Sequence, residues 1–113
     1  MGRSDSSLPK SAFLILLAIA DRPRHGLGIA DRIEEATEGR VKLGPGTLYH
    51  TLQKLEAGGL IRETAEAPDP DDDDARRRYY RLTPNGERAL RAEARHWQRL
   101  LEVATAHNLL GDR

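Results

Sequence analysis

The sequence predicts a mainly α-helical fold with one small β-hairpin, and three features predict it. Apolar residues recur every three or four positions in four separate segments, which is the period of an α-helix. Two short segments, 60–66 and 76–83, instead favour strands, and they flank a loop that contains Pro68 and Pro70. No cysteine occurs among the 113 residues, so the fold depends on packing and not on disulfides.

The first predicted helix spans about residues 9–20 and follows a polar arm, residues 1–8. Pro9 stands in the first turn, where a helix tolerates proline, and the segment is apolar on nearly all sides. A helix that is apolar on every side is buried on every side. We therefore expect one face of this helix in the domain core and another face against a second copy of the chain.

The second predicted helix spans about 26–38, after a break at 21–25, and Gly39 ends it. Its expected inward residues are Leu27, Ala30 and Ile33, with Ala36 or Thr37. Residues 41–43 then offer a short strand.

The third predicted helix spans about 45–57 and begins through Gly44-Pro45-Gly46. Leu48, Leu52 and Leu55 form its inward stripe, and Gly58-Gly59 ends it. A helix entered through glycines presents bare N–H groups and the positive end of the helix dipole, which suits a phosphate.

The second strand of the hairpin alternates between two faces. Tyr80 and Leu82 share one face, while Arg77, Tyr79 and Arg81 share the other. We expect the Tyr80 face to lie in the core.

Charge is balanced in total but unevenly distributed. Eighteen Lys and Arg residues match eighteen Asp and Glu residues, whereas a DNA-binding domain is expected to be basic. Five aspartates lie within residues 69–74, and three arginines follow at 76–78. The aspartate run lacks the spaced ligands and central glycine of a calcium loop, so we interpret it as a solvated tip.

The last predicted helix begins at Pro84, with Thr83 as its N-cap, and runs to about residues 107–109. Apolar residues recur along it at alternating steps of four and three, a heptad-like seam too short for an independent coiled coil. We expect this seam to form a homodimer interface with the first helix. The expected interface residues are Phe13, Leu14, Leu17, Leu90, Ala94, Trp97, Leu101 and Ala104.

These elements together predict a winged helix-turn-helix DNA-binding domain over 9–83, followed by a C-terminal dimerisation helix and tail over 84–113. Glutamine can pair with adenine, threonine can touch a thymine methyl, and basic side chains can contact phosphates. The expected DNA contacts are Lys42, Gly46, Thr47, Tyr49, His50, Gln53, Lys54, Arg76, Arg77 and Arg78.

Several short motifs also occur in a fixed order. They are His25-Gly26, Gly46-Thr47-Leu48-Tyr49, Gly59-Leu60-Ile61 and Arg78-Tyr79-Tyr80-Arg81-Leu82-Thr83 with Gly86. In this order they resemble the PadR family of bacterial transcriptional regulators, in its short form with a single C-terminal helix. The long helix after the wing favours this family over MarR-like or ArsR-like winged helices.

The resemblance implies a homodimeric repressor that binds a pseudo-palindromic operator in double-stranded DNA. Some short members hold planar hydrophobic ligands at the dimer interface, which would place an effector at Trp97, Phe13 and Leu101; the alternative for Trp97 is a plain interface residue. The chain departs from the family at Leu27-Gly28, where Tyr-Glu is frequent, and at His50, where proline is frequent.

Other functions have weaker support. A winged-helix protein-interaction module without DNA binding is the alternative that neutral charge favours. No P-loop and no histidine–carboxylate cluster occur, so we expect no enzyme activity, no cofactor and no metal. Met1-Gly2 with Ser6 and the apolar run 12–20 formally match lipidation and signal patterns, but the run is better explained as the first helix. It is also shorter than the roughly 20 residues that span a bilayer, so we expect a cytoplasmic protein.

Overall fold

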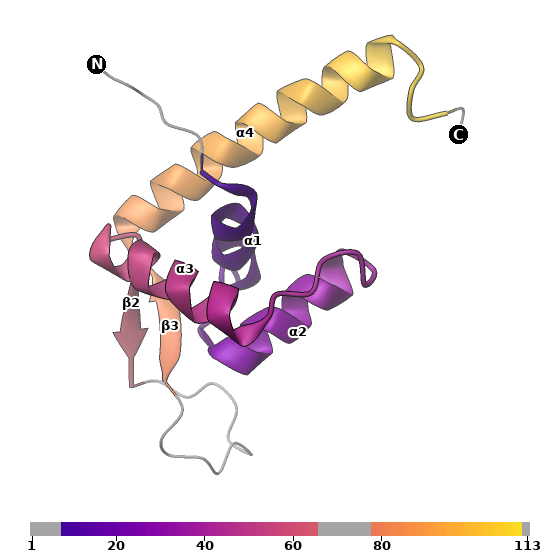
Figure 1. Cartoon of the computed structure of the whole chain (residues 1–113). Helices are drawn as coiled ribbons and strands as arrows, with labels where there is room; N and C mark the ends of the chain where they lie inside the picture. Colours follow the sequence, from indigo (N-terminus) through magenta and orange to yellow (C-terminus); the bar gives the residue numbers. More distant parts are fainter. Residues whose placement is uncertain (1–7, 66–77, 112–113) are drawn as a thin grey trace.

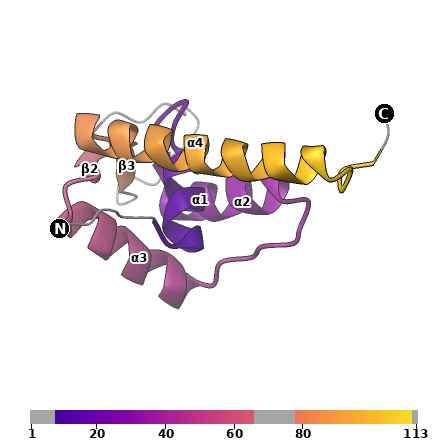
Figure 2. The same cartoon turned by 90° about the horizontal axis from the view of Figure 1, so that it is seen from above.

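The computed structural model describes residues 8–65 and 78–111. Its elements are α1 (Lys10–Ala18), β1 (Arg24–His25), α2 (Gly26–Ala36), α3 (Pro45–Ala57), β2 (Ile61–Thr64), β3 (Tyr79–Leu82) and α4 (Pro84–Ala106). Helix α1 lies at the centre, with α2 and α3 below it and α4 crossing above (Figure 1). Seen from above, α3 and α4 lie on opposite sides of the molecule, with α1 between them (Figure 2). The predicted helical fold with a small hairpin is confirmed.

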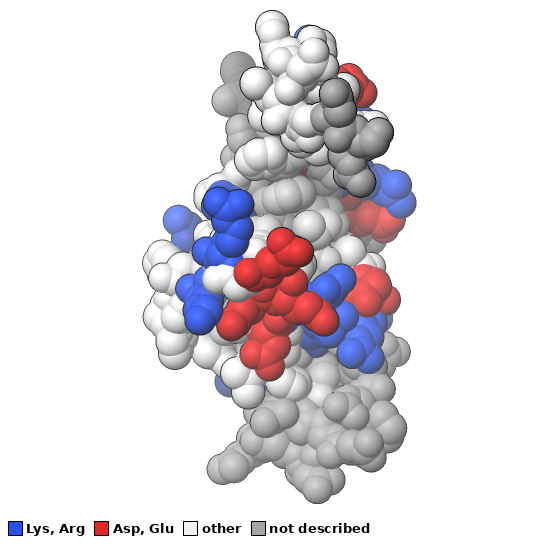
Figure 3. Space-filling model, turned by 90° about the vertical axis from the view of Figure 1, so that its right-hand side faces the viewer, with Lys and Arg blue, Asp and Glu red and all other residues white. Residues whose placement is uncertain are grey.

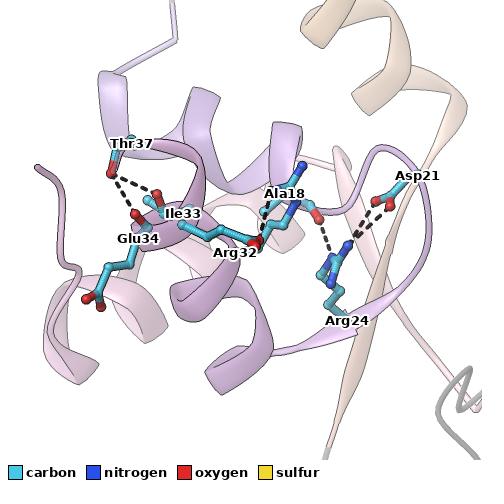
Figure 4. Close-up of polar contacts among 8 residues, drawn as sticks. Ala18, Asp21, Arg24, Arg32, Ile33, Glu34 and Thr37 are labelled. Carbon is cyan, nitrogen blue, oxygen red and sulfur yellow. Dashed lines mark hydrogen bonds and ion pairs between the residues drawn. The ribbon is translucent and has the colours of Figure 1, made fainter. Parts of the chain in front are cut away.

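The sheet contains a third strand that the sequence did not predict. Strand β1 lies at Arg24–His25, in the segment predicted as a break, and the predicted strand at 41–43 is wrong. Residues 41–43 stay close to α2 because the N–H of Val41 donates to Oγ1 of Thr37 at 3.1 Å. The same hydroxyl donates to the carbonyl of Ile33 at 2.8 Å, so it caps the end of α2 and turns the chain toward α3 (Figure 4).

Strand order in the antiparallel sheet is β1-β3-β2, so β3 is central. Tyr80 lies opposite Glu63 and is 6% exposed, and its place in the core confirms the predicted face. Burial, together with the Glu63 carboxylate, raises the pKa of the Tyr80 phenol. The prediction for Tyr79 is wrong, because it is also buried, at 5% exposed. The added strand β1 places His25 opposite Tyr79, and the two rings meet edge to face with centroids 5.3 Å apart.

Arg24 fastens β1 to the end of α1. Its Nε donates to the carbonyl of Ala18 at 2.7 Å, and its guanidinium pairs with Asp21 at 3.2 Å (Figure 4). Partial burial alone would raise the pKa of Asp21, but the Arg24 charge and the hydrogen bonds to this carboxylate outweigh it and hold the pKa below its ordinary value. The connection between α1 and α2 is thereby fixed beside the sheet.

The core forms where α1 meets the other elements. The predicted stripe of α3 is confirmed, since Leu48, Leu52 and Leu55 are buried. In α2 the expectation for Leu27 is wrong: its side chain is 56% exposed, and Ile29 is buried instead. The largest fully buried side chains are Ile15, Leu16, Ile29, Ile33, Leu52 and Ile61.

We call the unit formed by α1, α2, α3 and the three-stranded sheet the head. Helix α4 packs against the head only along its first half. Gly86, Leu90 and Glu93 are buried there, whereas Trp97 and Leu101 farther along are 40% and 54% exposed. The second half projects beyond the head (Figures 1 and 2).

A buried carboxylate joins α4 to the start of α1. Helix α1 has no side-chain cap and no acidic residue in its first turn. Glu93 of α4 is 6% exposed and accepts a hydrogen bond from the N–H of Leu8 at 3.3 Å. The carboxylate thus lies at the positive end of the α1 dipole, where a negative charge is stabilising.

Candidate nucleic-acid interface

The outward face of α3 carries polar side chains over its whole length. Gly46, His50 and Gln53 are exposed and follow one another at helical spacing, opposite the three buried leucines. Thr47 and Lys54 are exposed on one flank of this row. The structure therefore brings these five predicted contact residues together on one accessible surface.

The start of α3 is open to an incoming group. Its N-cap, Gly44, provides no side-chain hydrogen bond, and its first turn contains no acidic residue. A Cβ added to Gly44 or Gly46 would meet no atom within 4 Å. Bare amides and free space at the positive end of a helix suit a phosphate group.

Tyr49 joins α3 to the start of α2. Its side chain is 48% exposed, and its ring covers Gly26, where an added Cβ would lie 2.5 Å from Tyr49 Oη. The hydroxyl is therefore held beside the first turn of α2. Only a residue without a side chain at position 26 leaves room for this contact.

His25 caps α2 and contacts the base of the wing, the hairpin formed by β2 and β3. Its Nδ1 accepts a hydrogen bond from the N–H of Gly28 at 3.1 Å, while its ring packs against Tyr79. His25 therefore has a structural role at the junction of α2 and the wing.

Replacing His25 by alanine should lower the free energy of unfolding by about 1 kcal/mol, the usual effect of losing an N-cap acceptor. The His25→Asn variant is the matched control, because it also lacks the imidazole ring but keeps a capping acceptor. Urea denaturation followed by circular dichroism measures both. If His25→Asn were as destabilising as His25→Ala, the cap would contribute nothing.

Basic side chains surround the α3 face. The Nζ atom of Lys42 lies 3.9 Å from Oε2 of Glu34, and Nη1 of Arg78 lies 3.5 Å from Oε2 of Glu63. Both ion pairs are exposed. Exposed ion pairs are worth little, so these cations remain available to phosphates. The predicted contacts Arg76 and Arg77 lie outside the described residues.

Two further basic residues were missed by sequence reasoning. The exposed side chains of Arg40 and Arg62 make no hydrogen bond or ion pair within residues 8–65 and 78–111. Arg62 lies directly opposite Arg81 across the hairpin, and like charges in such a pair are destabilising without an anion. Only the strand register, which the sequence does not supply, identifies that pairing.

Acidic side chains gather on α2. Its outward face, here called the α2 acidic face, carries Asp31, Glu34, Glu35 and the following Glu38. Acidic side chains lie together at the centre of the side that faces right in Figure 1, with basic side chains to either side (Figure 3). Segregation of the two signs explains how a chain of zero net charge presents surfaces suited to an anion.

The residues expected at the dimer seam differ in their exposure. Phe13 and Trp97 stack with ring centroids 6.0 Å apart and an interplanar angle of 22°. Leu17 and Leu101 are exposed, and Leu14 packs partly against the core. Leu90 was expected at the interface, but it is only 7% exposed and belongs to the core of its own chain. It has little surface left for a second copy.

Neither a metal centre nor a membrane span is found in the described part of the chain. Within 8–65 and 78–111, no group of three or more His, Asp or Glu side chains is placed to hold a metal ion. In the same ranges no helix has the length and apolar character needed to cross a bilayer.

A helical head with an exposed third helix, an adjacent hairpin and an appended long helix defines a winged helix-turn-helix protein. Residues 15–92 match the model of the transcriptional regulator PadR-like family, and the chain belongs to that family. It is therefore a DNA-binding transcriptional regulator and not an enzyme.

Known relatives agree with this assignment. The chain is 36% identical over 86 residues to the transcriptional regulator Rv3488 of Mycobacterium tuberculosis, covering 76% of this chain and 74% of that protein. It is 41% identical over 87 residues to an uncharacterised 37.1 kDa protein of a Streptomyces fradiae transposon, covering 77% of this chain but only 23% of that relative. The structure of a PadR family regulator from Clostridium difficile shares the fold, with a TM-score of 0.69, 24% identity, and coverage of 85% of this chain and 95% of that chain.

Proposed function

We propose that the protein is a homodimeric repressor that binds a pseudo-palindromic operator, using residues 9–83 to contact DNA and residues 84–113 to dimerise. The observation that carries the proposal is the exposed row of polar side chains on α3, flanked by Lys54 and preceded by the exposed Lys42, on a molecule whose long helix leaves an apolar face partly exposed. Because operator DNA lies in the cytoplasm of a bacterial cell, the proposed repressor would act there.

The apolar face of α4 supports the dimer. Trp97, Leu101 and Ala104 continue the line of Leu90 beyond the head, and within the described residues Trp97, stacked on Phe13, stays 40% exposed and Leu101 54% exposed. Leu17 of α1 is 45% exposed and adds to the same kind of surface. A chain of this size gains stability by burying such apolar surface against a second copy.

Dimerisation would set the spacing of two α3 helices. Helix-turn-helix dimers contact half-sites about 34 Å apart, one turn of B-DNA. Each α3 would enter a major groove, with Gln53 and His50 near base edges and Lys54 near a phosphate.

Salt dependence of DNA binding tests the phosphate contacts. In a double variant, Lys42→Ala with Lys54→Ala, the log–log slope of affinity against salt should fall by about 2 per protomer, because each truncated side chain leaves one phosphate without its cation. Fluorescence anisotropy with a labelled duplex at several salt concentrations measures the slope. On a duplex long enough for one dimer only, the exposed pair Arg99→Ala with Arg95→Ala, on the opposite side of the molecule, is the control and should leave the slope unchanged. If the first variant behaved like the control, the alternative of a protein-interaction module would be favoured.

A small planar hydrophobic effector would bind beside Trp97, Phe13 and Leu101. Trp97 is already stacked on Phe13 on one side and is 40% exposed, so an aromatic surface remains accessible. By favouring a different spacing of the two heads, such a ligand would lower DNA affinity. Because Trp97 is the only tryptophan, quenching of its fluorescence by a planar dye reports binding directly. Unchanged fluorescence and unchanged DNA affinity at saturating dye would exclude this site.

A further inference from the structure

The side of α4 that faces away from the head carries a row of arginines that DNA reading by α3 does not use. We call Arg88, Arg91, Arg95 and Arg99 the α4 arginine stripe. All four are exposed and lie within one side of the helix, across from Leu90 and Trp97. Helices α3 and α4 lie on opposite sides of the molecule, so this stripe cannot reach a duplex held by α3 of the same chain (Figure 2).

The charge of the stripe is only partly neutralised. Arg91 pairs with Glu87 at 2.8 Å, an exposed contact. Arg95 and Arg99 make no side-chain hydrogen bond or ion pair within the described ranges. Beside them lies a shallow depression of about 560 Å³, lined by both arginines, by Gln98 and Glu102, and by Val103 and Ala106. The stripe therefore combines unpaired positive charge with a depression of mixed polar and apolar lining.

The α2 acidic face of the same chain has the complementary character. Asp31 and Glu38 make no side-chain hydrogen bond or ion pair within residues 8–65 and 78–111, and Glu35 pairs only with Arg32, at 3.1 Å. One turn before Asp31, Leu27 is 56% exposed. On α2 the apolar Leu27 thus lies one turn from acidic residues, and on α4 the apolar Val103 lies one turn from arginines. The two surfaces are complementary in charge and each has an apolar residue at one end.

The spacing of the two rows also matches. Residues 27, 31 and 35 rise along α2 in steps of four, and residues 103, 99 and 95 descend along α4 in steps of four. With a rise of about 1.5 Å per residue, both rows extend over about 12 Å. Antiparallel helices would therefore place Leu27 at Val103, Asp31 at Arg99 and Glu35 at Arg95.

We propose that the α4 arginine stripe docks the α2 acidic face of another copy of this protein. The two surfaces differ, so the contact is heterologous and leaves one stripe and one acidic face free to bind further molecules. Neither surface includes the apolar seam of α4, so the contact links dimers to one another. Neighbouring molecules on DNA would thereby bind cooperatively.

Charge reversal and rescue test this contact without DNA. The weight-average mass, measured by light scattering over a protein concentration series, should grow at about 0.01 M salt and return to a constant value at about 1 M, where charges are screened within about 3 Å. The Arg95→Glu/Arg99→Glu variant and the Asp31→Lys/Glu35→Lys variant should each weaken the low-salt association about tenfold, since each removes two exposed pairs and adds repulsion. Mixed in equal amounts, the two variants should associate again, because the unchanged stripe of one meets the unchanged α2 acidic face of the other and the reversed charges also attract.

Absence of growth at low salt, or failure of the mixture to associate, would overturn the proposal. If Arg95→Glu/Arg99→Glu left self-association unchanged but weakened binding to non-specific duplex, the stripe would be a nucleic-acid surface instead. The mass at high salt reports the α4 seam separately, so a monomer there would contradict the proposed dimer without deciding the stripe.

Discussion

Replacing Leu101 by arginine should convert the protein from a dimer to a monomer and lower its affinity for a two-half-site operator by about a hundredfold or more, because linked binding to two half-sites is lost. Leu101 is 54% exposed in the single chain, on the apolar line of α4 that continues past the head. A guanidinium buried against a second apolar helix would have no partner there, and an unpaired buried charge is strongly unfavourable. Sedimentation equilibrium gives the mass, and anisotropy titration gives the affinity.

Gln98→Arg is the matched control for this change. It adds the same charge three residues earlier, on the polar side of the same helix. It should remain dimeric and bind the operator as the natural protein does. A dimeric Leu101→Arg variant with undiminished affinity would contradict the proposed interface.

Replacing Gly86 by alanine should lower the free energy of unfolding by about 3 kcal/mol, since overpacking a rigid site is costly. Gly86 lies in the first turn of α4, directly against the chain between α3 and β2. A Cβ there would overlap the carbonyl oxygen of Leu60, which also accepts the N–H of Thr83 at 3.1 Å. The obstacle is backbone, so it cannot rotate away as a side chain would.

Gly46→Ala provides the comparison for Gly86→Ala. An added Cβ at position 46 meets nothing within 4 Å, and alanine favours a helix over glycine. Its stability should be unchanged or up to about 1 kcal/mol higher. Urea denaturation followed by circular dichroism compares the two variants; a loss below about 1 kcal/mol for Gly86→Ala would show that the α3–β2 turn moves aside.

Helical periodicity was sufficient to predict much of this fold. The leucines of α3 and the glycines around them define a helix by local rules, and the structure places that helix as expected. Local rules failed where a partner far along the chain decides the outcome. Strand β1 contains two residues and exists because β3 is beside it, and Tyr79 is buried because β1 is there.

The candidate site also has one part that local rules predicted and one part that they did not. The exposed row on α3 follows from the residues of that helix alone, so sequence reasoning identified His50 and Gln53. Arg40 and Arg62 were missed because a single arginine in a turn or strand has no motif. Arg40 and Arg62 stand out only because no acidic side chain among the described residues pairs with them. For Arg62 the strand register, which places it opposite Arg81, adds to this.

Selection of binding sites from a random duplex library tests the central claim most directly. A homodimer with one α3 in each half-site should enrich a sequence with twofold symmetry and half-site centres about 10 base pairs apart. Gln53→Ala should change the preferred base at specific positions of each half-site while leaving the spacing intact. Enrichment of no sequence, or of an asymmetric sequence that Gln53→Ala selects equally well, would contradict it.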